Sequence, residues 1–82
     1  MGVVFTDIAM QALKNIRKDD TERWRLAIIG KLQSDNVFNH CRRLPRPDGK
    51  AVYLYVMQDL HITFEDGPDE RTVWNVTSVP RP

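Results

Sequence analysis

Residues 51–79, AVYLYVMQDLHITFEDGPDERTVWNVTSV, decide the fold, because apolar and polar side chains alternate along much of their length. Alternation is typical of strands, in which successive side chains point to opposite faces of a sheet. The short connection of Gln58 and Asp59 and the turn-forming residues 66–70 divide the stretch into three segments. The stretch therefore predicts three antiparallel strands at residues 51–57, 60–65 and 71–79.

The alternation also predicts which side chains face the rest of the domain. An antiparallel sheet commonly has one buried face and one solvated face. We expect helices to cover the aliphatic set, which is Val52, Leu54, Val56, Leu60, Ile62 and Phe64. The solvated face, where functional residues are expected, would then display Tyr53, Tyr55, His61, Thr63 and Glu65.

Two amphipathic helices are predicted before this sheet, after a short first strand at residues 3–5. Thr6 or Asp7 can cap the first helix, and residues 19–21 offer a cap for the second. A short connection predicts that the helices pair as an antiparallel hairpin. Spacings of three and four define one apolar stripe on each helix. The stripes are Ile8, Ala9, Ala12, Leu13 and Ile16, then Trp24, Ala27, Ile28 and Leu32.

The remaining segments complete a single domain. Residues 37–44 are a further candidate strand, and residues 45–49 (PRPDG) indicate a turn. The 82 residues suffice for one hydrophobic core and are too few for two, so residues 1–82 are predicted to form one domain. The expected fold is α+β, with a short N-terminal strand and a two-helix hairpin packed on a small antiparallel sheet. Trp24 and Trp74 are expected in the core, with an anchor in a protein interface as the alternative for either.

The composition indicates a cellular compartment and argues against a bound metal. No apolar run approaches the ~18–20 residues that a membrane-spanning helix needs, and the N-terminus lacks the pattern of a signal peptide. The single cysteine, Cys41, cannot form an internal disulfide, and no cysteine–histidine cluster has the spacing of zinc ligands. We therefore expect a cytoplasmic protein that uses no metal or other cofactor.

Positive charge gathers in one segment, although the net charge is only +1. Residues 36–57 contain four basic side chains and one acidic side chain, whereas residues 58–82 are net acidic. The basic side chains are Arg42, Arg43, Arg46 and Lys50. Such a cluster can bind the phosphates of a nucleic acid, and it is also typical of a solvated loop.

The order of these elements, together with particular stretches of sequence, resembles the RelE/ParE superfamily of toxins from type II toxin–antitoxin systems. Residues 5–18 are similar to the family's opening strand and first helix. Residues 43–44, a turn and residues 53–56 are similar to the start of its sheet. Residues 60–65, an acidic turn and residues 73–79 are similar to its terminal hairpin. The resemblance spans nearly the whole chain.

The resemblance implies a microbial toxin that inhibits growth until a small antitoxin protein masks it. The RelE branch cuts mRNA in the ribosomal A site without a metal, and the ParE branch blocks DNA gyrase. For a ribonuclease, the resemblance gives Tyr53, Tyr55, His61 and Arg81 catalytic positions. His61 would act as an acid or base near neutral pH, Arg81 would hold a phosphate, and the tyrosines would stack on bases. The implied partners are an antitoxin and a ribosome with its mRNA.

A second hypothesis uses the same scaffold without catalysis. Tyr53 and Tyr55 fall where the RelE branch often has lysines, and His61 falls where it usually has an arginine. The sheet face and the sheet edges would then bind a protein. The chain would be a ParE-like gyrase inhibitor or an orphan domain that forms a homodimer. The sequence leaves both hypotheses open.

Overall fold

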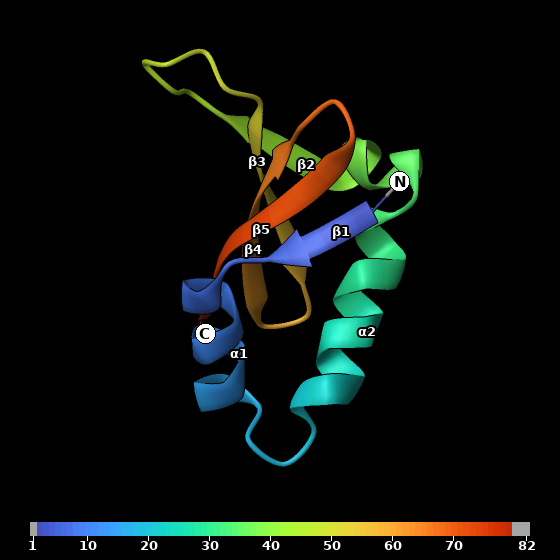
Figure 1. The fold of residues 1–82 in the computed structure, drawn as a ribbon, viewed down its shortest axis with the longest axis vertical. Helices are drawn as coiled ribbons and strands as arrows, with labels where there is room; N and C mark the ends of the chain where they lie inside the picture. The colour runs from blue at the N-terminus through green and yellow to red at the C-terminus, as the bar shows by residue number, and fades with distance from the viewer. Residues whose placement is uncertain (1, 80–82) are drawn as a thin grey trace.

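A computed structural model of the chain describes residues 2–79 (Figure 1). An N-terminal strand is followed by two helices, a short 3₁₀ helix and four more strands. The elements are β1 (Gly2–Phe5), α1 (Asp7–Ile16), α2 (Thr21–Leu32), the 3₁₀ helix (Asp35–His40), β2 (Cys41–Leu44), β3 (Val52–Met57), β4 (Leu60–Asp66) and β5 (Glu70–Ser78). The predicted α+β fold is confirmed, including the helical hairpin and the strand within residues 37–44.

The five strands form one sheet in the order β1-β5-β4-β3-β2. Pairing is antiparallel from β2 to β5, as predicted, but β1 lies parallel to β5 at the edge of the sheet. A parallel neighbour requires a long crossover, and the two helices together with β2, β3 and β4 separate β1 from β5 along the chain. The sheet is therefore mixed rather than wholly antiparallel.

The register between β3 and β4 determines which side chains share a face. Residues directly opposite each other in an antiparallel pair lie on the same side of the sheet, and Tyr53 is opposite Phe64. Phe64 is completely buried in the core with side chains of both helices, so this side is named the covered face. The other side is named the open face. Its β3–β4 pairs are Val52 with Glu65, Leu54 with Thr63, and Val56 with His61.

The predicted orientation is confirmed for β4 and was wrong for β3. Both tyrosines of β3 pack against the core, and its aliphatic side chains belong to the open face. The cause is the two-residue turn of Gln58 and Asp59, in which Met57 pairs directly with Leu60. This pairing joins the odd-numbered residues of β3 to the even-numbered residues of β4. Gln58 has φ of 56°, the left-handed conformation that tight hairpin turns require.

The first helix begins as predicted. The Thr6 side-chain oxygen accepts a hydrogen bond from the Ala9 backbone N–H at 3.1 Å and caps α1. Ala9 and Leu13 are completely buried, but Ile8 is 73% exposed. Ile8 lies about 100° around the helix axis from Ala9, which takes it outside the stripe that meets the sheet.

The second helix buries a narrower stripe than predicted. Ile28 and Leu32 are completely buried, and Ala27 is exposed. Trp24 is half-buried: its indole N–H donates to Asp20 at 3.1 Å, and the Arg17 guanidinium lies 4.5 Å from its ring centroid. Trp24 therefore closes the margin of the core at the helical hairpin, with one polar edge near water.

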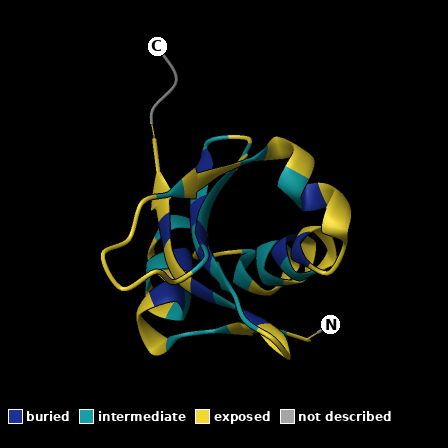
Figure 2. Ribbon diagram, turned by 90° about the horizontal axis from the view of Figure 1, so that it is seen from above, coloured by how far each residue is buried: buried dark blue, intermediate teal, exposed yellow. Residues whose placement is uncertain are grey.

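The core lies between the two helices and the covered face of the sheet. Figure 2 shows the buried segments on the helices and the strands, while the connecting loops are mostly exposed. Beyond the helical residues already named, the buried core cluster contains Val37, Leu60, Ile62, Phe64, Val73 and Val76. This cluster holds the helices in place and leaves the open face of the sheet without a covering layer.

One charged side chain is buried at the edge of this core. Arg71, 2% exposed, donates through Nε to Asp66 at 3.0 Å and through Nη2 to Asp35 at 2.6 Å. Its Nη1 donates to the Leu32 carbonyl at 2.6 Å, and the guanidinium carbon lies 4.7 Å from the Phe38 ring centroid. Arg71 thus joins β5, the end of β4, the end of α2 and the 3₁₀ helix.

Replacement of Arg71 with alanine is expected to lower the free energy of unfolding by about 3 kcal/mol, because it removes a buried bond to a carbonyl and partly buried bonds to two carboxylates. Urea unfolding followed by circular dichroism measures this loss. Arg25→Ala is the control, since it breaks an exposed pair with Glu22 and should change the free energy by less than about 0.5 kcal/mol. Similar losses in both variants would contradict the bridging role of Arg71.

Candidate nucleic-acid interface

The open face combines short polar side chains with exposed apolar ones. Three rows of neighbouring residues cross it from β3 through β4 to β5. They are Val52, Glu65 and Thr72; Leu54, Thr63 and Asn75; and Val56, His61 and Thr77. A surface of this kind offers hydroxyl groups and flat apolar contact, with one carboxylate and one imidazole for chemistry.

A β-bulge turns Trp74 toward this face. Thr63 pairs with Asn75 and the next residue, Phe64, pairs with Val73, so Trp74 is an extra residue in β5. Its indole N–H donates to Glu65 Oε1 at 3.2 Å, and the residue is 45% exposed. The expectation that Trp74 lies in the core was therefore wrong, because the bulge shifts the alternation of the strand.

The four basic residues of the predicted phosphate-binding cluster do not all lie on one face of the sheet. Arg42 is opposite Leu54, which places it in the middle row of the open face. Arg43 is opposite Tyr53 and belongs to the side of the covered face. Arg46 and Lys50 are in the loop between β2 and β3 and line a pocket on the open face. Three of the four cations are thus on or beside one surface.

The loop between β2 and β3 has an ordered tip. Arg46 Nη2 is 3.2 Å from Asp48 Oδ2, and Asp48 Oδ1 accepts from the Lys50 backbone N–H at 3.0 Å. The bond from Arg46, followed by that from Lys50, holds the pKa of Asp48 below its ordinary value. Gly49, with φ of 74°, supplies the left-handed residue that the turn needs. The carboxylate therefore stays ionised at neutral pH and limits the motion of Arg46.

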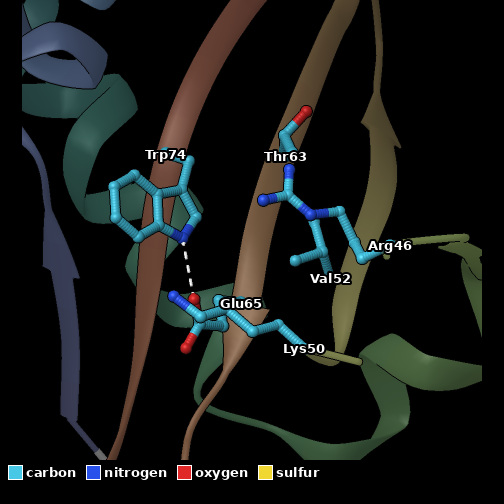
Figure 3. Close-up of a pocket in the computed structure, with 6 residues that line it drawn as sticks. All are labelled: Arg46, Lys50, Val52, Thr63, Glu65 and Trp74. Carbon is cyan, nitrogen blue, oxygen red and sulfur yellow. Dashed lines mark hydrogen bonds between the residues drawn. The ribbon is translucent and has the colours of Figure 1, made fainter. Parts of the chain in front are cut away.

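A pocket of about 220 Å³ opens at this end of the open face (Figure 3). Its lining comes from β3, β4, β5 and the loop, and consists of Arg46, Lys50, Val52, Thr63, Glu65 and Trp74. In Figure 3 the Arg46 guanidinium extends toward Thr63, and the Lys50 side chain extends toward Glu65. Val52, 4% exposed, lies beneath these longer side chains as an apolar floor.

His61 is on the open face, as predicted, but at some distance from this pocket. It is half-buried between Val56 and Thr77 on the neighbouring strands. Glu65 is four residues further along β4, which separates their Cα atoms by about 13 Å. The two side chains therefore do not form an acid–base pair, and the neighbours of the imidazole across the sheet are the apolar side chain of Val56 and the hydroxyl group of Thr77.

Tyr53 and Tyr55 are not brought to His61. The Tyr53 ring stacks on Phe64 with centroids 5.7 Å apart and meets the Phe38 ring edge-on at 5.0 Å. Tyr55 lines a second pocket of about 280 Å³ with α2 and the 3₁₀ helix, where Lys31 and His40 also lie. The register of β3 is the reason, since it directs both tyrosines to the covered face.

Arg81 lies outside the described residues. Within residues 2–79, no group of three or more histidine, cysteine, aspartate or glutamate side chains could hold a metal ion. Burial raises the pKa of the Cys41 thiol above its ordinary value, so this cysteine is a weak nucleophile. In the same part of the chain, no helix has the length and hydropathy needed to span a membrane.

Glu65 was placed on the correct face from the sequence, but Trp74 was assigned to the core and was missed as a member of the interface. A bulge adds one residue to a strand and is not visible in the hydrophobic pattern. The sequence does contain one indication of the bulge. Asn75, Val76 and Thr77 alternate between polar and apolar, but this alternation is established only for the second half of β5 and need not continue back to Trp74.

The comparison with solved structures finds a chain of the same fold. One chain of the crystal structure of the toxin–antitoxin complex RelBE2 from Mycobacterium tuberculosis superposes with a TM-score of 0.75. The match covers 95% of this chain and 90% of that one, at 14% sequence identity. The two chains share a fold. No family model and no curated protein sequence matches the chain.

The face assignment predicts a large and a small effect for two positions of β3 that lie on opposite faces of the sheet. Tyr53→Ala should lower the free energy of unfolding by roughly 2–3 kcal/mol, because it empties the space between Phe38 and Phe64. Val56→Thr should change it by less than about 0.5 kcal/mol, since Val56 is 50% exposed. Urea unfolding of both variants measures the difference. A larger loss for Val56→Thr would mean that β3 has the opposite orientation.

Proposed function

We propose that the chain is the toxin component of a type II toxin–antitoxin pair and that it acts on RNA through the open face of its sheet. The observation that carries the proposal is the gathering of Arg42, Arg46 and Lys50 on the face that also holds Trp74 and His61. Cations for phosphates and an aromatic ring for bases are the combination that single-stranded nucleic acids require. The fold shared with a chain of the RelBE2 complex supports the assignment to toxin–antitoxin systems.

The proposed reaction is metal-independent cleavage of mRNA on the ribosome. The 2′-OH attacks the adjacent phosphorus, the P–O5′ bond breaks, and the products are a 2′,3′-cyclic phosphate and a 5′-OH. A base must remove the 2′-OH proton, and an acid must protonate the leaving oxygen. His61 is assigned to proton transfer. The loop cations Arg46 and Lys50, which lie away from His61, bind neighbouring phosphates of the strand, and Arg81 keeps the phosphate-binding role that the family resemblance implies for it.

The proposed partner is an antitoxin protein that covers apolar surface left open on the helices and at the sheet edges. Ile8 on α1 is 73% exposed and Leu26 on α2 is 55% exposed. The edge strands β1 and β2 also present unpaired backbone groups on their outer sides. An extended or helical segment that crosses these features would bury them. The cytoplasm is the proposed compartment, as it holds both the ribosome and the antitoxin.

A non-catalytic function on the same face is the second candidate. Val56 and Trp74 are 50% and 45% exposed, and His61 is the one imidazole among the described open-face residues. An apolar surface with an exposed tryptophan is suited to bind a protein. The target would then be a protein such as DNA gyrase, or a second copy of the chain, and no bond in RNA would break.

Induced expression in a bacterium is expected to arrest growth and to produce cleaved mRNA, which primer extension detects. His61→Ala should reduce the cleavage rate by about 10²–10⁴, the usual contribution of a general acid or base. Lys50→Ala should weaken RNA binding, because one phosphate contact is lost. The matched control is Lys14→Ala on the exposed side of α1, which should act like the parent chain.

Three results separate the candidate functions. Normal growth during expression of the folded chain would refute the toxin assignment. Growth arrest with intact mRNA, unchanged by His61→Ala, would favour the non-catalytic function. Cleavage that continues in His61→Ala would leave the RNA target in place and remove His61 from the reaction.

A further inference from the structure

We propose that the pocket lined by Trp74 and Glu65 binds one base of single-stranded RNA and prefers bases that carry an exocyclic amino group. The inference rests on the proposed function and adds a specificity-determining residue to it, namely Glu65. At about 220 Å³ the pocket is smaller than the roughly 300–1,000 Å³ of sites for drug-sized ligands. Its size suits a single flat ring system rather than a whole nucleotide.

Trp74 provides the stacking surface of this subsite. The β-bulge places the indole beside the pocket, where the residue remains 45% exposed. Its N–H is already bonded to Glu65 at 3.2 Å, which fixes the orientation of the ring (Figure 3). A ring held in this way loses little conformational freedom when a base stacks on it. All four bases can stack, so Trp74 contributes affinity without selectivity.

Glu65 provides the selectivity. The indole N–H occupies Oε1, whereas Oε2 has no hydrogen-bond partner within residues 2–79 and can accept one from a ligand. A carboxylate accepts from the amino groups of cytosine, adenine and guanine. Uracil carries no amino group, and its single ring N–H is flanked by two carbonyl oxygens that the carboxylate repels. Glu65 therefore discriminates against uracil.

Arg46 and Lys50 provide the contacts to the phosphate of the bound nucleotide. Both line the pocket on the side of the β2–β3 loop, and Figure 3 shows both side chains extending across it. Lys50 has no ion-pair partner within the described part of the chain. A phosphate on this side leaves the base directed toward Trp74. The pocket thus brings together a cation, a stacking surface and an acceptor, the three kinds of group that the phosphate, ring and edge of a nucleotide require.

The experiment is a fluorescence titration of the full-length purified chain with tetracytidylate and tetrauridylate, which have equal length and charge. Quenching of Trp74 reports binding, and Trp74→Phe should abolish the quenching while the Trp24 emission remains. Tetracytidylate is expected to bind about tenfold more tightly than tetrauridylate, the effect of one hydrogen bond to a base edge. Cytidine monophosphate should bind more weakly than the tetranucleotide, because it offers fewer phosphates.

Glu65→Gln is the decisive variant. Glutamine keeps an oxygen for the Trp74 N–H and replaces the free oxygen with an N–H₂ donor. The preference should therefore invert, since the new donor matches a uracil carbonyl and opposes an amino group. A purely structural role for the Glu65–Trp74 bond would leave the ratio of the two affinities unchanged. Circular dichroism verifies that the variant is folded.

The outcomes are distinct from those of the expression test. Equal affinity for the two tetranucleotides, an unchanged ratio in Glu65→Gln, or no quenching of Trp74 would each overturn the base-binding inference. Growth arrest and mRNA cleavage would still support the proposed function in that case. If the chain binds the tetranucleotides selectively but does not arrest growth, the base-binding inference stands and the toxin assignment is refuted. Stronger binding of cytidine monophosphate than of the strand would identify a free nucleotide as the ligand.

Discussion

The buried guanidinium of Arg71 is the interaction on which the architecture depends. It reaches from β5 to the Leu32 carbonyl at the end of α2, to Asp66 at the end of β4 and to Asp35 in the 3₁₀ helix. A buried charge is tolerated only when its hydrogen-bonding capacity is met, so these elements must meet at one point. The same guanidinium holds the Phe38 ring, which in turn covers Tyr53. The 3₁₀ helix thereby closes the core over β3, and the opposite side of the sheet remains uncovered.

The two-residue turn between β3 and β4 decides what that uncovered side contains. A register shifted by one residue would exchange the side chains of the two faces of β3. In the observed register, the tyrosines complete an aromatic cluster around Phe64, and the open face receives aliphatic and threonine side chains. Charge reaches the open face mainly from Arg42 and from the β2–β3 loop. The groups proposed for recognition consequently come from a strand edge, a loop and one bulged tryptophan.

The sequence was sufficient to predict the helices and strands, but it was not sufficient to predict which residues meet at the candidate site. The cap of α1, strand order along the chain and the loops follow from local chemistry, as the Thr6 cap illustrates, whereas Asp20 at the start of α2 makes no side-chain capping bond. The orientation of β3 does not follow from alternation, because Tyr53 and Tyr55 form as apolar a set as Val52 and Val56. The length of the turn does determine the orientation of β3, since two intervening residues force Met57 to pair with Leu60. The burial of Arg71 depends on partners 36 and 39 residues away in the chain, which no local pattern encodes.

The near-neutral charge of the chain is compatible with nucleic-acid binding because its charges are separated in space. A further pocket, lined by Glu65, Asp69 and Glu70 among others, lies at the β4–β5 loop, whereas Arg46 and Lys50 border the neighbouring pocket. Glu65 belongs to both pockets and marks the boundary between the basic and the acidic side. An anionic backbone is attracted to one side of this boundary and repelled from the other. Such a gradient supplies little long-range attraction, but in the proposed function it would orient a strand with its phosphate toward the loop cations and its base toward Trp74.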